Sequence, residues 1–124
     1  MTLEKMRSYI HLNTTIKMER EKRTELKWDL KDENLTPLER LQLKRKLKEV
    51  CDNVKRAKQS IKEIEEFIDG ADDFTRQILY YRYIRGLSWT HVAMETGGYN
   101  NANAVRRITE RYINKSNKNI KEEK

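Results

Sequence analysis

The chain has 124 residues and a net charge of +7, with 38% charged and 36% hydrophobic residues. This length holds one domain, or one small domain with an extended appendage. Four glycines and one proline, without alternating apolar and polar runs, favour an all-α protein with narrow apolar seams. The single cysteine excludes an internal disulfide framework. No apolar run reaches the length of a membrane span, so we expect a cytoplasmic protein without a membrane partner.

A first helix is predicted from Thr2, which can cap it, to about Lys31. Its apolar residues recur at helical spacing as Tyr9, Leu12, Ile16, Leu26 and Leu30. Glu19 and Arg23 interrupt this stripe in the middle, so the seam is weak there.

A second helix is predicted from Pro37 to about Asp69. Thr36 is a good N-cap, Pro37 suits the first helical position, and Glu39 completes a capping box. Apolar residues then follow one another at steps of four and three, as Leu43, Leu47, Val50, Val54, Ala57, Ile61, Ile64 and Ile68. Such a heptad seam predicts a coiled-coil-like antiparallel hairpin over residues 1–70, closed within one chain or used for self-association.

Three shorter helices are predicted over residues 71–115. Asp72 or Asp73 can cap the first, in which Phe74, Ile78, Leu79, Tyr81 or Tyr83, and Ile84 are apolar. Gly86 stops this helix, and Ser88 caps the next one. A turn follows at residues 97–101, and the last helix begins near Ala102. Core packing is expected for Tyr80, Tyr81, Tyr83 and Trp89, and residues 116–124 form a basic polar tail.

The last helix concentrates positive charge. Between residues 102 and 121 there are six Lys or Arg and one acid, a net +5, and the rest of the chain is nearer to neutrality. A basic amphipathic helix after a tight turn can enter the major groove of double-stranded DNA. The candidate DNA contacts are Ser88, Thr90, His91, Asn101, Asn103, Arg106, Arg107, Arg111 and Lys115. Asn side chains suit adenine edges and Arg side chains suit guanine edges. Arg111 and Lys115 are better placed to contact phosphates. For Asn101 and Asn103, helix capping competes with base reading.

The stretch from Asp73 to Ala93 resembles region 4 of sigma-70 factors. The resemblance depends on four features: a helix ending in Arg-Tyr, a Gly-Leu-Ser corner, a Trp and a Val-Ala pair. These features lie at residues 79–83, 86–89, 92 and 93. Residues 105–108 resemble the start of the recognition helix. The Tyr-rich helix and the corner are especially similar to RinA/ArpU-like phage transcriptional activators. The resemblance covers little more than a third of the chain and implies a helix-turn-helix fold.

It further implies a sequence-specific DNA-binding regulator of a phage or prophage, acting in the bacterial cytoplasm. The hairpin would then form a homodimer or contact RNA polymerase. One alternative is a small-terminase-like subunit that recognises phage DNA for packaging and forms rings. Another is an adaptor whose hairpin binds and inhibits an acidic protein. No P-loop, dinucleotide turn, catalytic triad or pair of metal ligands is present in the sequence, so we expect no enzyme, cofactor or metal.

Overall fold

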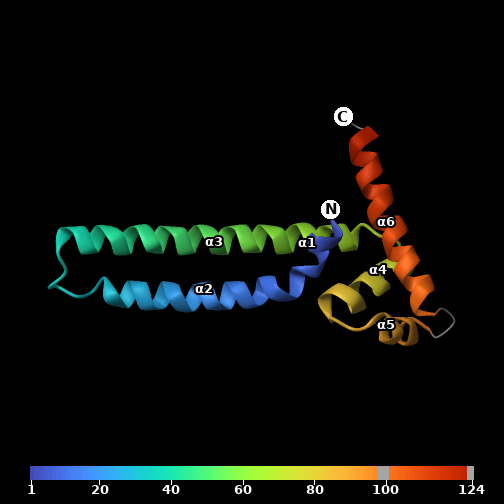
Figure 1. Ribbon diagram of the computed structural model, residues 1–124, viewed down its shortest axis with the longest axis horizontal. Helices are drawn as coiled ribbons and strands as arrows, with labels where there is room; N and C mark the ends of the chain where they lie inside the picture. Colours follow the sequence, from blue (N-terminus) through green and yellow to red (C-terminus); the bar gives the residue numbers. More distant parts are fainter. Residues whose placement is uncertain (98–100, 123–124) are drawn as a thin grey trace. The chain divides into compact units, whose positions relative to one another are not determined.

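The computed structural model describes residues 1–97 and 101–122, with side chains to residue 117. Every regular element in these residues is helical, which confirms the all-α prediction. The elements are α1 (Leu3–Arg7), α2 (Tyr9–Asp29), α3 (Pro37–Asp69), α4 (Asp73–Leu79), the π-helix η1 (Tyr80–Ile84), α5 (Trp89–Glu95) and α6 (Ala102–Glu122) (Figure 1). Residues 98–100 of the predicted turn lie outside the described residues.

The chain forms two compact units. Residues His11–Ile61 make the hairpin unit, and residues Met1–Ile10 together with Lys62–Lys124 make the C-terminal unit. This division differs from a boundary at residue 70, because the last turns of α3 and the first ten residues pack with the C-terminal helices. No described helix is both long and apolar enough to cross a membrane.

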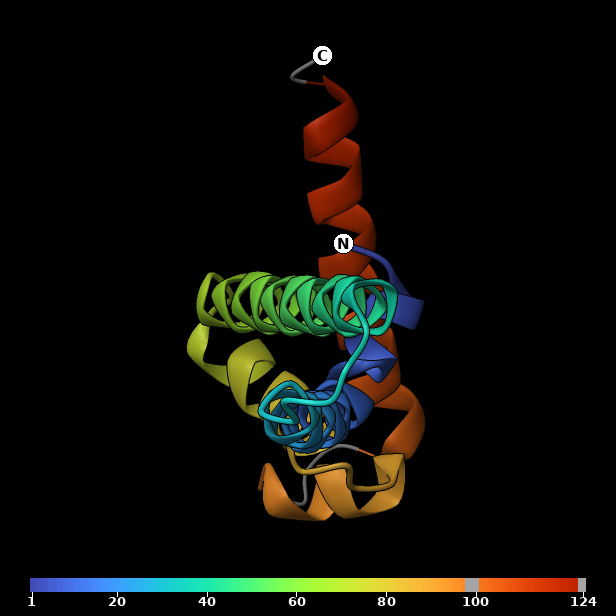
Figure 2. The same ribbon diagram turned by 90° about the vertical axis from the view of Figure 1, so that its left-hand side faces the viewer.

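In the hairpin unit α2 and α3 run antiparallel and side by side, and Figure 2 views them from the closed end. The start of α3 is as predicted, since the Thr36 hydroxyl accepts the backbone N–H of Glu39 at 3.1 Å. Every seam residue predicted on α3 is buried or half-buried. The heptad pattern therefore marks the packed face of α3.

Glu19 and Arg23 are polar residues in the seam of α2. The Glu19 side chain is only 13% exposed and lies 3.5 Å from the ammonium of Lys22. Its carboxylate also accepts from the Asn53 amide on α3, at 3.5 Å. A slipped register would break this contact between α2 and α3, while each group would keep a partner on its own helix, Lys22 for Glu19 and Arg56 for Asn53.

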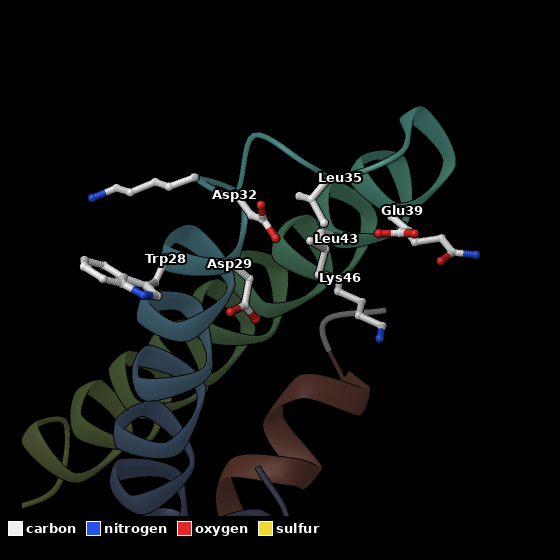
Figure 3. Close-up of a pocket in the computed structure, with 9 residues that line it drawn as sticks. Trp28, Asp29, Asp32, Leu35, Glu39, Leu43 and Lys46 are labelled. Carbon is white, nitrogen blue, oxygen red and sulfur yellow. The ribbon is translucent and has the colours of Figure 1, made fainter.

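The closed end of the hairpin is fastened by Arg40. Its guanidinium donates to the backbone carbonyls of Leu30 and Asp32, at 2.9 and 3.0 Å. These carbonyls follow the last turn of α2, where helix geometry leaves acceptors unpaired. Figure 3 shows the hollow beside this end, lined by residues that include Leu35 and Leu43, with Trp28 at its border.

The prediction of one continuous first helix is wrong. The chain forms α1, breaks at Ser8 and resumes as α2. The Ser8 hydroxyl donates to the carbonyl of Lys5 at 2.6 Å, and serine bonded to nearby backbone in this way weakens a helix. The break seats α1 in the C-terminal unit, where Met6 is fully buried and Lys5 pairs with Glu63.

The predicted helix before Gly86 changes character at Tyr80. Asp72 caps α4 by accepting the backbone N–H of Thr75 at 3.3 Å, and η1 then closes a five-residue turn from Arg85 N–H to the carbonyl of Tyr80 at 3.0 Å. Such a turn is wider than an α-helical turn and shifts the side chains that follow it. Tyr83 is consequently buried. Tyr80 is exposed, so the prediction that it packs in the core is wrong.

The C-terminal unit has its own apolar core. Ile78, Val92, Ala93 and Val105 are buried at its centre, and Phe74, Tyr81, Leu87, Trp89 and Ile108 pack around them. These residues come from α4, η1, α5, α6 and the turn before α5, so four helical elements, of which α4 and η1 are continuous, close around one core.

The last helix is longer than predicted. The backbone of α6 continues to Glu122, through the segment expected to be a tail. Tyr112 holds its middle, because its ring packs 4.7 Å from the Phe67 ring and its hydroxyl donates to the Phe67 carbonyl at 2.7 Å. Further along, the Asn117 side chain accepts from the Met1 ammonium at 3.0 Å. Tertiary contacts thus stabilise a helix that its composition leaves marginal.

Candidate DNA-binding interface

The corner before α5 is held by several groups. Gly86 has a φ of 72°, a backbone conformation that glycine adopts without strain. The Arg82 guanidinium donates to the Leu87 carbonyl at 3.0 Å and lies 4.6 Å from the centre of the Trp89 ring. These contacts combine a charge-assisted hydrogen bond with a cation–π contact. They fix the direction in which α5 leaves η1.

The first turn of α5 carries three of the predicted contacts. The Ser88 hydroxyl accepts the backbone N–H of His91 at 3.3 Å and lies 2.7 Å from His91 Nδ1. Ser88, Thr90 and His91 are all exposed. Ser88 is therefore the N-cap of α5, and its hydroxyl orients the imidazole at the surface.

The first turn of α6 separates the two asparagines. The Asn101 side-chain oxygen accepts the backbone N–H of Ala104 at 2.8 Å, which caps the helix. Asn103 is exposed on the first turn. A bidentate bond to adenine uses both ends of the amide, so Asn103 suits base reading better than Asn101.

The two long faces of α6 differ sharply. Val105, Thr109 and Ile113 are buried, and the Thr109 hydroxyl donates to the Val105 carbonyl at 3.1 Å. The opposite face is exposed and consists of Asn103, Arg106, Arg107, Glu110, Arg111, Asn114 and Lys115. At 100° per residue Arg107 lies at the centre of this face, one turn after Asn103. The described side chains give it four positive charges and one negative charge.

Arg106 and Arg107 are not equivalent. The Arg106 guanidinium pairs with the Glu110 carboxylate at 3.2 Å, one turn further along α6. Arg107 has no ion-pair partner among the residues with described side chains. An exposed pair of this spacing contributes at most about 0.5 kcal/mol, so Arg106 can be released by a competing phosphate. Lys118 and Lys121, which also contribute to the predicted basic patch, lie outside the described side chains.

A buried tyrosine lies under this interface. Tyr83 is 3% exposed, and within the described residues its hydroxyl is buried without a hydrogen-bond partner. Its ring meets Trp89 edge to face, with centroids 6.4 Å apart. Burial raises the pKa of Tyr83 above its ordinary value, against the opposing effect of Arg82 and other nearby arginines.

Two residues that pack within the C-terminal unit were not predicted to do so from the sequence. Phe67 and Met6 lie on segments that were predicted to form only the hairpin, yet both pack within the C-terminal unit. The signal available for Phe67 was an aromatic residue directly beside the seam position Ile68. In the described part of the chain no three His, Cys, Asp or Glu residues come together as a metal site.

No protein-family model, curated protein or solved structure matches the chain. The resemblance to sigma-70 region 4 therefore stays a prediction from the residues that carry it.

Proposed function

We propose that the protein binds double-stranded DNA in a sequence-specific manner, with α6 as the recognition helix. The exposed face of α6 carries the proposal, because Arg107 lies there among three further cations, two amides and one acid, while the opposite face is buried. A rigidly held helix with polar groups on its first turn and cations further along matches the requirements of major-groove reading.

Each residue has a different role in this proposal. Asn103 and Arg107 read base edges near the start of α6. Arg111 and Lys115 contact phosphates, which adds affinity without sequence information. Ser88, Thr90 and His91 at the start of α5 contact the backbone beside the groove, and Asn101 caps α6.

The biological role that fits best is transcriptional regulation in a phage or prophage, inside a bacterial host. This part rests on the resemblance of residues 73–93 to sigma-70 region 4. A homodimer would place two copies of α6 on half-sites one helical turn of DNA apart, or a multiple of that distance. RNA polymerase is the proposed protein partner.

The test is DNA binding by the purified full-length protein, at two salt concentrations, against fragments of its own genomic neighbourhood. We expect tight binding to one fragment over a weaker, salt-sensitive background. Arg107→Ala should remove the preference for that fragment, while Arg106→Ala should cost less because this side chain also pairs with Glu110. One bidentate contact to a base is worth about 1–3 kcal/mol, or roughly 5- to 150-fold in affinity.

The matched control is Arg76→Ala, which removes an arginine that pairs with Asp73 on α4. It should leave the fragment preference unchanged, and circular dichroism should show intact helices in all three variants. Equal preference in wild type and Arg107→Ala would exclude α6 as the recognition helix. The native mass separates the roles, since a dimer fits a regulator and a ring of many copies fits the packaging alternative.

A further inference from the structure

The hairpin unit carries as much net positive charge as residues 102–121. Residues 11–61 contain fourteen Lys or Arg and nine Asp or Glu, a net charge of +5. Residues 62–101 are net acidic, with four basic and seven acidic residues. The near-neutral sum outside the last helix therefore conceals a strongly basic hairpin.

The two edges of the hairpin are defined by their place beside the seam. In an antiparallel pair of helices, residues that directly precede seam residues share one edge, and residues that directly follow them share the other. The structure agrees with this geometry, because one groove is lined by residues that precede seam positions on both helices. They include Lys22 and Glu25 from α2, and Lys46 and Glu49 from α3.

The edge formed by residues that directly precede seam residues carries both signs of charge. Towards the closed end it continues with Asp29, and Figure 3 shows Asp29 and Lys46 lining the same hollow. Lys22, Lys46 and Arg56 are balanced there by Glu25, Asp29 and Glu49. Opposite charges of this kind across a helix pair are mutually favourable.

The other edge carries one sign of charge. The residues that follow the seam are Asn13, Lys17, Arg20, Thr24 and Lys27 on α2, and Lys44, Lys48, Cys51, Lys55 and Lys58 on α3. We name the seven cations among them the cationic edge, and all seven are exposed. No acid occupies these positions in the fully described span 11–61. The nearest acids are Glu21, which lines one hollow together with Lys17 and Arg20, and Asp52, which lies one turn from Lys48 and Lys55 on α3.

An edge of this kind lowers the stability of the hairpin. Like charges across a helix pair repel, and here both helices present cations to the same edge. Mobile counterions screen part of the repulsion, and a polyanion along the edge would neutralise it while releasing those counterions. From Lys44 to Lys58 the edge extends about 21 Å at 1.5 Å per residue. That length matches roughly six base pairs at 3.4 Å each.

We infer that the cationic edge binds the phosphate backbone of double-stranded DNA and is a second, sequence-independent DNA contact besides α6. The inference rests on the proposed function in taking DNA as the polyanion. Charge complementarity selects this occupant, because the positions that follow the seam carry seven cations and no acid, without the base-reading pattern found on α6. The hairpin thereby adds affinity and leaves sequence preference to α6.

The experiment measures how binding to a 30-base-pair duplex of arbitrary sequence depends on salt, with the full-length protein. The edge variant is Lys48→Gln with Lys55→Gln. The control variant, Arg45→Gln with Lys46→Gln, removes the same charge from exposed positions of the same helix that lie off the edge. Two lost phosphate contacts should flatten the slope of log K against log salt by about 1.8. The control should change the slope by less than a third of that amount.

Equal losses in both variants, or no loss in the edge variant, would overturn the inference. So would binding of anionic lipid vesicles in preference to the duplex. A second edge variant, Lys17→Gln with Arg20→Gln, repeats the test on α2. Thermal unfolding of each free protein checks the fold, and the edge variants should be as stable as wild type or more stable, because repulsion is relieved.

The two proposals fail separately. The edge variant should keep the ratio of affinities for the preferred and arbitrary fragments, whereas Arg107→Ala should collapse this ratio. A wild-type protein without a preferred fragment, whose edge variant still loses salt-dependent binding, would refute sequence-specific recognition and leave the edge standing. A preserved preference with unchanged salt slopes would refute the edge alone.

Cys51 offers an independent readout, because this single cysteine lies between Lys48 and Lys55 of the cationic edge and directly follows the seam residue Val50. A photo-crosslinker attached to Cys51 should capture the duplex. The comparison is the same label on Ser60→Cys in a Cys51→Ser background, since Ser60 is also half-buried and directly precedes the seam residue Ile61, on the edge that carries both signs of charge. Stronger capture from position 60 than from position 51 would contradict the assignment.

Discussion

At the scale of single residues, the buried hydroxyl of Tyr83 is the least expected feature. A buried polar group without a hydrogen bond costs about 1–3 kcal/mol relative to a satisfied one. The Tyr83 ring is valuable in the same place, because it contacts Trp89 edge to face. The ring and the hydroxyl therefore have opposite effects on stability.

Tyr83→Phe should leave the free energy of unfolding unchanged or raise it by up to about 1 kcal/mol, because it keeps the ring and removes the unsatisfied group. Urea denaturation at neutral pH measures this, with the exposed Tyr80→Phe as control. The raised pKa of Tyr83 leads to a second prediction, on the pH dependence of stability. The stability that the raised pKa of Tyr83 contributes is fully present at pH values below the ordinary pKa of tyrosine, and it is lost as the pH rises through the folded-state pKa. The Phe variant has no such group, so its free energy of unfolding should fall less in alkali than that of the wild type. A loss above about 1 kcal/mol at neutral pH would mean that the hydroxyl is bonded.

The individual contact residues were foreseen unevenly. Side-chain chemistry and helical spacing place Arg107 and Asn103 on one face from sequence alone. The cap formed by Asn101 and the pairing of Arg106 with Glu110 needed the structure. Both depend on rotamers, which several nearby partners compete to set.

At the scale of elements, the helix starts were predictable and the interruptions were not. Thr2, Thr36 and Ser88 each cap a helix as their sequence context indicates. The break at Ser8 and the π-helix at Tyr80 occur in sequences with good helical periodicity. Local propensity permits a continuous helix at both places, and packing in the C-terminal unit decides against it.

Gly86 and Gly70, which each follow a helix, should respond differently to substitution. Gly86 has a φ of 72°, and an added Cβ would lie 2.8 Å from Ile10 Cδ1. Gly86→Ala should therefore cost about 1–2 kcal/mol from the backbone alone. At Gly70 an added Cβ meets nothing closer than 3.5 Å, and Gly70→Ala should be neutral or stabilise by up to about 1 kcal/mol.

Chemical denaturation of both variants checks this contrast. In an Ile10→Ala background the steric part of the Gly86→Ala cost should disappear and the backbone part should remain. Equal effects of the two glycine substitutions would show that Gly86 is not held in the left-handed conformation.

At the scale of the whole molecule, the division into units is the main result. The hairpin is shorter than predicted, and the first ten residues complete the C-terminal unit. A fragment that begins at residue 70 would lack Phe67 behind Tyr112 and Met6 in the core. We expect such a fragment to fold poorly, so DNA binding is best tested on the full chain.

Two methionines test this division. Met6 is fully buried in the C-terminal unit, whereas Met18 is 52% exposed on α2. Met6→Ala should lower the free energy of unfolding of the C-terminal unit by about 2–5 kcal/mol. Met18→Ala should change it by less than about 0.5 kcal/mol. Trp89 fluorescence reports the transition in a Trp28→Phe background, since Trp28 is 72% exposed. Similar effects of the two substitutions on the free energy of unfolding would show that α1 is not part of the core of this unit.

The sequence by itself determined the helical class, the seam of the hairpin, the caps and the cationic face of the last helix. These depend on periodicity and on interactions within a few residues, which are readable along the chain. The tertiary structure decided where α1 packs, how far α6 extends and which tyrosine is buried. Each of these is set by contacts between segments distant in sequence, such as Met1 with Asn117 and Phe67 with Tyr112. Local propensities leave such choices open, because packing energy between segments exceeds the small preferences of single residues.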